Sequence, residues 1–131
     1  MIVIDASVLT EALTGDGTAG KAARARLMRD THWAAPEHLL VETFHAVRGR
    51  LLEQKITPER ADAAVAALSD VSLETVQVRR LLPRMWELRQ NVSGHDAAYL
   101  AAAEAFGCPL ITGDARLSRC GSARCAIEVI G

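Results

Sequence analysis

The sequence predicts a three-layer α/β/α sandwich, in which helices cover both faces of a mostly parallel β-sheet. Short apolar runs bounded by turn residues alternate along the chain with longer stretches of helical spacing, and this alternation is typical of βαβ units. The chain has 131 residues, of which 50% are hydrophobic, a length and composition that suit one core. We therefore expect residues 1–131 to form a single domain.

The first part of the chain combines two predicted strands with three helices. The expected strands cover residues 1–5 and 32–35, and the expected helices cover residues 6–13, 18–29 and 36–55. Gly15 and Gly17 separate the first two helices, because paired glycines favour a turn. Pro36 is expected at the first position of the third helix, where the missing N–H of proline would be unpaired anyway.

The rest of the chain carries clearer boundary signals. Thr57 and Pro58 predict a helix start, with the threonine as cap and the proline at the first helical position. The following strands are expected at residues 71–78, 108–112 and 126–130, and the helices at 79–90, 93–106 and 114–119. Pro83 is tolerable only in the first turn of its helix. Gly107 is expected to end the helix that precedes it.

The composition limits the binding partners and the cellular compartment that we expect for this protein. No apolar stretch approaches the roughly 20 residues of a membrane span, and the N-terminus lacks the pattern of a secretory signal, so we expect a cytoplasmic protein with no membrane partner. The formal net charge of −1 argues against binding nucleic acid by bulk charge alone. The cations are nearly all arginine, whose fork suits phosphate contacts. The three cysteines lack zinc-type spacing and receive no function.

Four acidic residues stand where strands turn into helices or just inside a helix. Asp5 ends the first predicted strand, Asp114 follows the strand at 108–112, Asp96 opens an alanine-rich helix, and Glu42 lies near the start of a long helix. The carboxyl ends of parallel strands gather at one edge of the sheet, where such folds bind ligands. Crowded carboxylates repel each other unless a divalent cation neutralises them. The pattern thus predicts a metal site that uses carboxylates.

Ordinary structural roles are also open for these acids. Asp5 and Asp114 are candidate helix caps, and Asp96 is the candidate reciprocal partner of Ser93 in a capping box. Capping does not exclude a site, because a cap at a strand end points toward the ligand crevice. Glu42 lies nearly opposite the apolar stripe of its helix, which predicts an exposed glutamate. That stripe consists of Leu40, Phe44, Val47 and Leu51.

The segments that carry these acids resemble those of PIN domains, especially the VapC-type toxins of bacterial toxin–antitoxin pairs. They are Ile-Val-Ile-Asp-Ala-Ser-Val-Leu at 2–9, Pro-Glu-His-Leu-Leu-Val-Glu at 36–42, His-Asp-Ala-Ala-Tyr-Leu at 95–100 and Pro-Leu-Ile-Thr-Gly-Asp-Ala-Arg-Leu at 109–117. Their order, their separations and the chain length all match the family. Two departures are His95, where the family often has an aromatic residue, and the lack of a further acid soon after Asp114.

The resemblance implies a Mg²⁺- or Mn²⁺-dependent endoribonuclease that is paired with a small antitoxin and forms a homodimer. Asp5 and Asp96 are expected to be the leading metal ligands, Asp114 to complete or tune the site, and Glu42 to orient water or hold a second ion. Hard cations of this kind prefer oxygen ligands and suit phosphodiester chemistry.

Further residues are expected to support the same site. The hydroxyls of Ser7 and Thr112 are candidates for fixing the carboxylate rotamers, although helix capping and strand-end hydrogen bonds explain them equally well. Arg116 and Arg119 are the candidate RNA-binding residues because they lie beside Asp114 in the sequence.

Three other functions remain open. An aspartate-based phosphohydrolase would use Asp5 as its nucleophile, but such enzymes usually carry a second aspartate two residues later, where this chain has Ser7. A receiver-like binding domain would need a lysine at a late strand end, and the only lysines are Lys21 and Lys55. A catalytically weak PIN-like module that binds RNA or protein is the third alternative.

Overall fold

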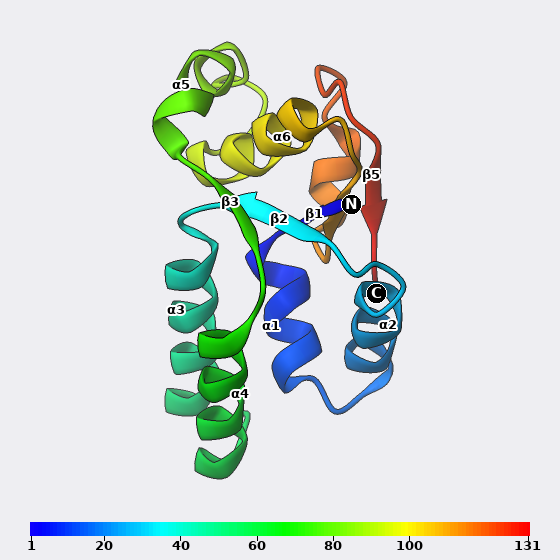
Figure 1. Cartoon of the computed structure of the whole chain (residues 1–131). Coiled ribbons are helices and arrows are strands. Elements are labelled where there is room, and N and C mark those ends of the chain that lie inside the picture. The colour runs from blue at the N-terminus through cyan, green and yellow to red at the C-terminus, as the bar shows by residue number, and fades with distance from the viewer.

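The computed structural model describes residues 1–131 and has a five-stranded sheet at its centre (Figure 1). The strands are β1 (Ile2–Ile4), β2 (Trp33–Pro36), β3 (Glu74–Val76), β4 (Leu110–Thr112) and β5 (Ile127–Val129). They lie in the order β3-β2-β1-β4-β5, and every neighbouring pair is parallel. The first strand of the chain is therefore the central strand of the sheet.

Helices cover both faces of this sheet, as predicted. They are α1 (Ala6–Thr14), α2 (Thr18–Leu27), α3 (Leu39–Leu52), α4 (Pro58–Asp70), α5 (Val78–Glu87), α6 (Gly94–Phe106) and the short 3₁₀ helix η1 (Ala115–Arg119). In Figure 1, α1 to α4 lie on one face of the sheet, and α5 and α6 lie on the other. The predicted α/β/α sandwich is confirmed, and its sheet is wholly parallel. No helix is long and apolar enough to span a membrane.

The register of the central strands brings two strand ends to one place. Val3 pairs with Ala34 of β2 on one side and with Leu110 of β4 on the other. Beyond the strand, the N–H of Asp5 donates to the carbonyl of Ile111 at 3.2 Å. The carboxyl ends of β1 and β4 therefore lie side by side, at the edge where parallel sheets bind ligands.

The core lies between the sheet and its covering helices. All three residues of β1 are buried, and so is every residue of α6 from Ala97 to Ala103. Five of those seven residues of α6 are alanines, whose small side chains let the helix pack closely against β1 and β2. This close packing gives the acidic start of α6 a defined position relative to the end of β1.

Predicted caps agree with the structure at several helix ends. Thr57 accepts a hydrogen bond from the N–H of Arg60 at 3.1 Å, with Pro58 at the start of α4. Gly107 closes α6 in the left-handed conformation, with φ of 65°. Most strands are shorter than predicted; β3, for example, spans only Glu74–Val76 instead of residues 71–78. β2 keeps its predicted length of four residues but begins one residue later.

Two prolines were placed wrongly from the sequence. Pro36 ends β2, where it pairs with Val76, and α3 begins only at Leu39. The strand position is tolerated because the ladder continues through the N–H of Glu37, which donates to the Val76 carbonyl. Pro83 lies inside α5 rather than in its first turn.

The buried face of α3 also differs from the prediction. Its buried residues are Leu39, Thr43 and Val47, whereas Leu40 and Phe44 of the predicted stripe are 40% and 50% exposed. The buried face of α3 is rotated relative to the predicted one because Thr43 takes a core position. The predicted stripe included only apolar residues and therefore left Thr43 out. Large apolar side chains of α3 are thereby left on the surface.

Candidate active site: four carboxylates at one edge of the sheet

Asp5 is a buried carboxylate at the carboxyl end of the central strand. It caps α1 by accepting the N–H of Val8 at 3.0 Å, as predicted. The Ser7 hydroxyl donates to the same oxygen at 2.6 Å, and the Thr112 hydroxyl donates to the other oxygen. Burial raises the pKa of Asp5 above its ordinary value, these hydrogen bonds oppose the rise, and the nearby Asp96 adds to it.

Ser7 and Thr112 connect the ends of β1 and β4 around Asp5. The Ser7 hydroxyl accepts the N–H of Gly113 at 2.9 Å, and the Thr112 hydroxyl accepts the N–H of Asp114 at 3.0 Å. A Cβ at Gly113 would lie 3.2 Å from the Ser7 hydroxyl oxygen, so a larger residue there would press on this network. Both hydroxyls predicted to support the site therefore contact the Asp5 carboxylate directly.

Asp96 lies in the first turn of α6, on the opposite face of the sheet from α1. Its N–H donates to the Ser93 hydroxyl at 3.2 Å, which forms one half of the predicted capping box. Burial raises the pKa of Asp96, and the charges of Asp114 and Glu42 raise it further. The negative charges of Asp114 and Glu42 therefore act on Asp96, and the charge of Asp96 acts on Asp5. The four predicted acids share one electrostatic environment.

Asp114 is paired with a cation from its own segment. It caps η1 by accepting the N–H of Arg116 at 2.9 Å, and it binds the guanidinium of Arg116 through both carboxylate oxygens. This arginine lowers the pKa of Asp114 below its ordinary value. Arg116 is thus engaged with an acid of the site, while Arg119 of the same helix is exposed and forms no ion pair.

Glu42 is not the fully exposed glutamate that its helix alone predicts. Its side chain is 29% exposed, and the hydroxyl of Tyr99 donates to its Oε1 at 2.8 Å. His38 Nε2 also lies 2.8 Å from this oxygen, but at an angle that does not suit a ring N–H hydrogen bond. Burial, reinforced by Glu42, raises the pKa of Tyr99, so its phenol stays a hydrogen-bond donor.

Sequence reasoning missed Tyr99 and set His38 aside. Helical spacing carries the signal that could have found them, since Tyr99 follows Asp96 by three residues and His38 precedes Glu42 by four. Tyr99 thus lies on the same face of α6 as Asp96, and His38 lies one residue before α3, one helical turn ahead of Glu42. Tyr99 is also the only tyrosine of the chain.

Comparison with known protein families identifies the domain that carries these acids. The family model described as the PIN domain matches residues 2–122. This chain belongs to the PIN domain family. Ribonuclease VapC9 of Mycobacterium tuberculosis is 37% identical to it, with 99% of this chain and 98% of the relative aligned. Ribonuclease VapC1 of the same species is 36% identical, with 98% and 96% aligned.

A solved PIN-like structure supports the same architecture. VapC20 of Mycobacterium tuberculosis, described as a sarcin-ricin loop cleaving toxin, superposes with a TM-score of 0.72. Its sequence identity is 20%, and the superposition covers 100% of both chains. This similarity concerns the fold, which extends over the whole length of both proteins.

The PIN site has the donor chemistry of a divalent-cation site without a preassembled ligand set. No group of three histidine, cysteine or acidic side chains lies close enough together to hold a metal ion. Asp5 is held by hydroxyls, Asp114 by Arg116 and Glu42 by Tyr99. The carboxylates nevertheless provide the hard oxygen donors that Mg²⁺ and Mn²⁺ prefer. A cation there would relieve the repulsion that raises the pKa of Asp96.

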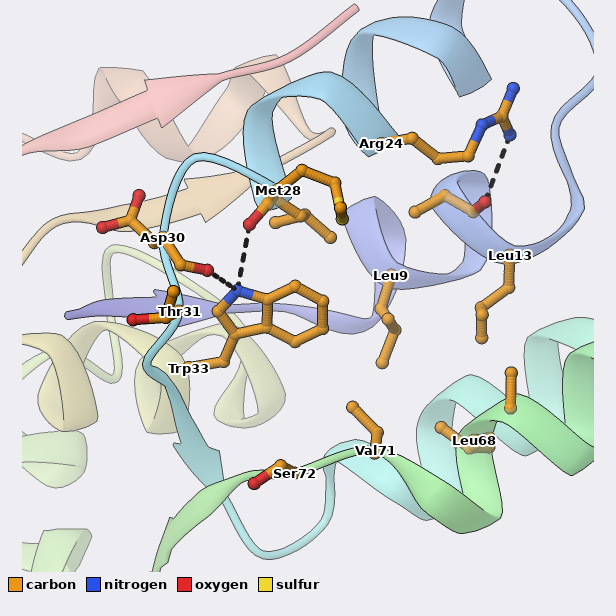
Figure 2. A pocket seen from close by; sticks show the side chains of 13 residues that line it. Leu9, Leu13, Arg24, Met28, Asp30, Thr31, Trp33, Leu68, Val71 and Ser72 are labelled. Atoms are coloured by element: carbon orange, nitrogen blue, oxygen red, sulfur yellow. Dashed lines mark hydrogen bonds between the residues drawn. The ribbon is translucent and has the colours of Figure 1, made fainter.

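A separate apolar groove lies away from the acids, between α1, α2 and α4 (Figure 2). Its volume is about 660 Å³, and none of the four site carboxylates lines it. Leu9 and Leu13 of α1 face Leu68 and Val71 across it, and the exposed Met28 lies at its rim. Exposed apolar grooves of this kind mark interaction sites.

Proposed function

We propose that this PIN domain is a metal-dependent endoribonuclease that cleaves RNA phosphodiester bonds and acts in the cytoplasm as the toxin of a toxin–antitoxin pair. The names of the relatives VapC1 and VapC9, both ribonucleases aligned over nearly the whole chain, support a nuclease activity. The observation that carries the proposal is the geometry that joins these acids at one sheet edge. Thr112 bonds the Asp5 carboxylate and the N–H of Asp114, and Tyr99 connects Glu42 to the helix that begins with Asp96.

Asp5 and Asp96 are the residues that would hold Mg²⁺ or Mn²⁺, with Asp114 completing the set. When bound, such an ion would supply Lewis-acid stabilisation of the charge that develops on the phosphodiester. Ser7 and Thr112 hold the Asp5 carboxylate in one orientation through their hydroxyls. Glu42 keeps its Oε2 free of hydrogen bonds, so this oxygen can orient a water molecule and accept its proton.

Arg116 and Arg119 are proposed to contact RNA phosphates beside these acids. Arg116 has an 80% exposed side chain, although its guanidinium now binds Asp114. Release of Asp114 toward a cation would free the arginine for a phosphate, which it can bind with the same two-pronged geometry. Arg119 is exposed and unpaired already.

The proposed protein partner is a small antitoxin, and the groove between α1, α2 and α4 is the surface we assign to it. The groove is lined mainly by leucine, alanine, methionine and tryptophan side chains, which suits an apolar helix or strand of a partner. A second copy of the chain is the other proposed partner, through the apolar side chains exposed on α3 and α5.

Cleavage of RNA by the purified protein tests the nuclease proposal. We expect cleavage with Mg²⁺ or Mn²⁺, none in EDTA, and at least a 100-fold loss in Asp5→Asn and Asp96→Asn. Asp62→Asn is the matched control, because Asp62 is an exposed aspartate of α4 that no ion pair engages. RNA products are followed on denaturing gels, and the new RNA ends are sequenced after brief expression in cells.

The remaining outcomes separate the alternatives. Cleavage that survives in EDTA contradicts the metal mechanism. Release of phosphate from a small monoester by wild type but not by Asp5→Asn indicates an aspartate-based phosphohydrolase. RNA binding without cleavage under any divalent ion indicates a catalytically weak PIN-like binding module.

A further inference from the structure

Glu42 differs from the other site acids in the origin of its hydrogen-bond partner. Asp5 and Asp114 are held by residues at the strand ends themselves. Glu42 is held by Tyr99, a residue of another helix that lies 57 positions away in the sequence. The contact therefore connects the acid of α3 to the helix that begins with Asp96.

The side chain of Tyr99 is held rigidly by the packing of the core. Its side chain is only 2% exposed and belongs to the main hydrophobic core, where it is among the largest fully buried side chains. A packed ring with two torsions has little freedom, so its hydroxyl stays in one place. A glutamate on a surface helix is otherwise mobile, and restraining it requires a partner that offsets the loss of rotamer entropy.

The surroundings of Glu42 restrain one of its two oxygens. The Tyr99 hydroxyl and His38 Nε2 each lie 2.8 Å from Oε1. The His38 ring also lies against the Tyr99 ring, with centroids 4.9 Å apart. Oε2 forms no hydrogen bond, so it is the oxygen left for a ligand of the site.

We propose that Tyr99 is a positioning residue for the nuclease reaction proposed above: by holding Oε1 of Glu42, it presents Oε2 to the water that attacks the phosphodiester. Tyr99 does not touch the substrate in this role. It acts through Glu42, whose carboxylate orients the water and takes its proton as the new P–O bond forms. The bond from phosphorus to the leaving ribose oxygen breaks, and that oxygen takes a proton from solvent. The role depends on the proposed activity and adds a residue to it.

Tyr99→Phe removes the hydroxyl and leaves the ring in the core. We expect kcat for RNA cleavage to fall roughly 10- to 100-fold, a fraction of what a general base contributes, with KM for RNA unchanged. Glu42→Gln is expected to lose at least as much. The decisive comparison is the double variant, in which Tyr99→Phe should have less than about a twofold further effect, because the group that it positions is already lost.

Controls separate positioning from general damage to the fold. Thr14→Val also removes one buried hydroxyl, which donates to the carbonyl of Thr10 at 2.7 Å at the end of α1 farthest from Asp5, and it should leave kcat unchanged. Glu42→Asp keeps the carboxylate, leaves the core intact and shortens the reach to Tyr99, so it should lose activity like Tyr99→Phe. Binding of Mn²⁺, followed by the electron paramagnetic resonance of the free ion, should not change in Tyr99→Phe.

The outcomes distinguish this proposal from the function on which it rests. If wild type cleaves RNA and Tyr99→Phe cleaves equally well, the positioning role is wrong while the nuclease stands. A loss of the same size with and without Glu42→Gln also contradicts it, because a purely structural role predicts that result. If Tyr99→Phe is unfolded by circular dichroism, an undiminished kcat in Glu42→Asp overturns the proposal. An inactive wild type overturns both the positioning role and the nuclease.

Discussion

At the scale of single residues, the folded chain holds Asp96 in an unfavourable place for a charge. Burial raises its pKa, and the charges of Asp114 and Glu42 add to the effect. An acid whose pKa is higher in the folded than in the unfolded state binds its proton more tightly when folded. The free energy of unfolding therefore falls as pH rises from the unfolded pKa through the folded pKa, and the full penalty is present above it. Active sites commonly store instability of this kind.

Asp96→Asn should stabilise the protein at neutral pH while abolishing its activity. The amide removes the buried charge and its repulsion by Asp114 and Glu42, so we expect Tm to rise by roughly 2–4 °C at pH 7.5. The difference should be smaller at pH 4, because the raised pKa of Asp96 makes this carboxyl take up its proton at a higher pH than an ordinary aspartate does. Differential scanning fluorimetry at both pH values measures it, with Asp62→Asn as the control. A lower Tm for Asp96→Asn at pH 7.5 would contradict the electrostatic account.

The site residues whose positions depend on local contacts could be predicted from the sequence, whereas those that depend on contacts between distant helices could not. Asp5 and Asp114 were predicted both as caps and as strand-end acids, because capping is local and the strand pattern placed both ends at one edge. Periodicity alone predicted an exposed Glu42, because the periodicity of α3 contains no information about α6; only the family resemblance assigned this residue to the site. Its partner Tyr99 is brought to it by the packing of two helices on opposite faces of the sheet.

At the scale of elements, α5 forms despite a proline in its interior. Pro83 has no N–H to donate to the carbonyl of Arg79, and its ring crowds that turn. Local rules alone predicted a first-turn position for Pro83, and the structure instead begins the helix at Val78. Packing against α6 compensates for the missing bond, because Leu81 and Leu88 of this segment are buried. Such tertiary compensation is absent from a local sequence pattern.

Pro83→Ala should therefore stabilise α5. The exposed alanine restores one backbone hydrogen bond and removes the steric conflict, and we expect the free energy of unfolding to rise by about 1 kcal/mol. Part of the gain is lost because alanine leaves the unfolded chain more flexible than proline does. Urea denaturation measures the change, with Arg79→Ala, an exposed position of the same helix, as the control. An unchanged or lower stability would show that the helix is already relaxed around the proline.

At the scale of the whole molecule, the alternation of strands and helices was enough to predict the layers, but not which helix faces remain uncovered. The predicted core stripe of α3 turned outward because Thr43 took the inward position. Val41 and Phe44 of α3 are exposed, and so are Leu82 and Trp86 of α5. In Figure 1 the two helices lie on the left of the molecule, although they cover opposite faces of the sheet. Val41 of α3 lines a hollow together with Val78 and Met85 of α5. Large apolar side chains exposed near one another commonly mark protein–protein interaction sites.

We expect this α3–α5 surface to be the interface of a homodimer. Phe44→Glu and Trp86→Glu each place a charge on it, and burying an unpaired charge in an interface is strongly unfavourable. Both variants should therefore elute as monomers in size-exclusion chromatography with light scattering at concentrations where wild type is dimeric. Met28→Glu is the matched control, because Met28 is also an exposed apolar residue but lines the groove assigned to the antitoxin. This variant should stay dimeric and lose antitoxin binding instead. If Met28→Glu dissociates the dimer while Phe44→Glu and Trp86→Glu do not, the two surfaces have exchanged roles, because each charge disrupts only the interface in which it is buried.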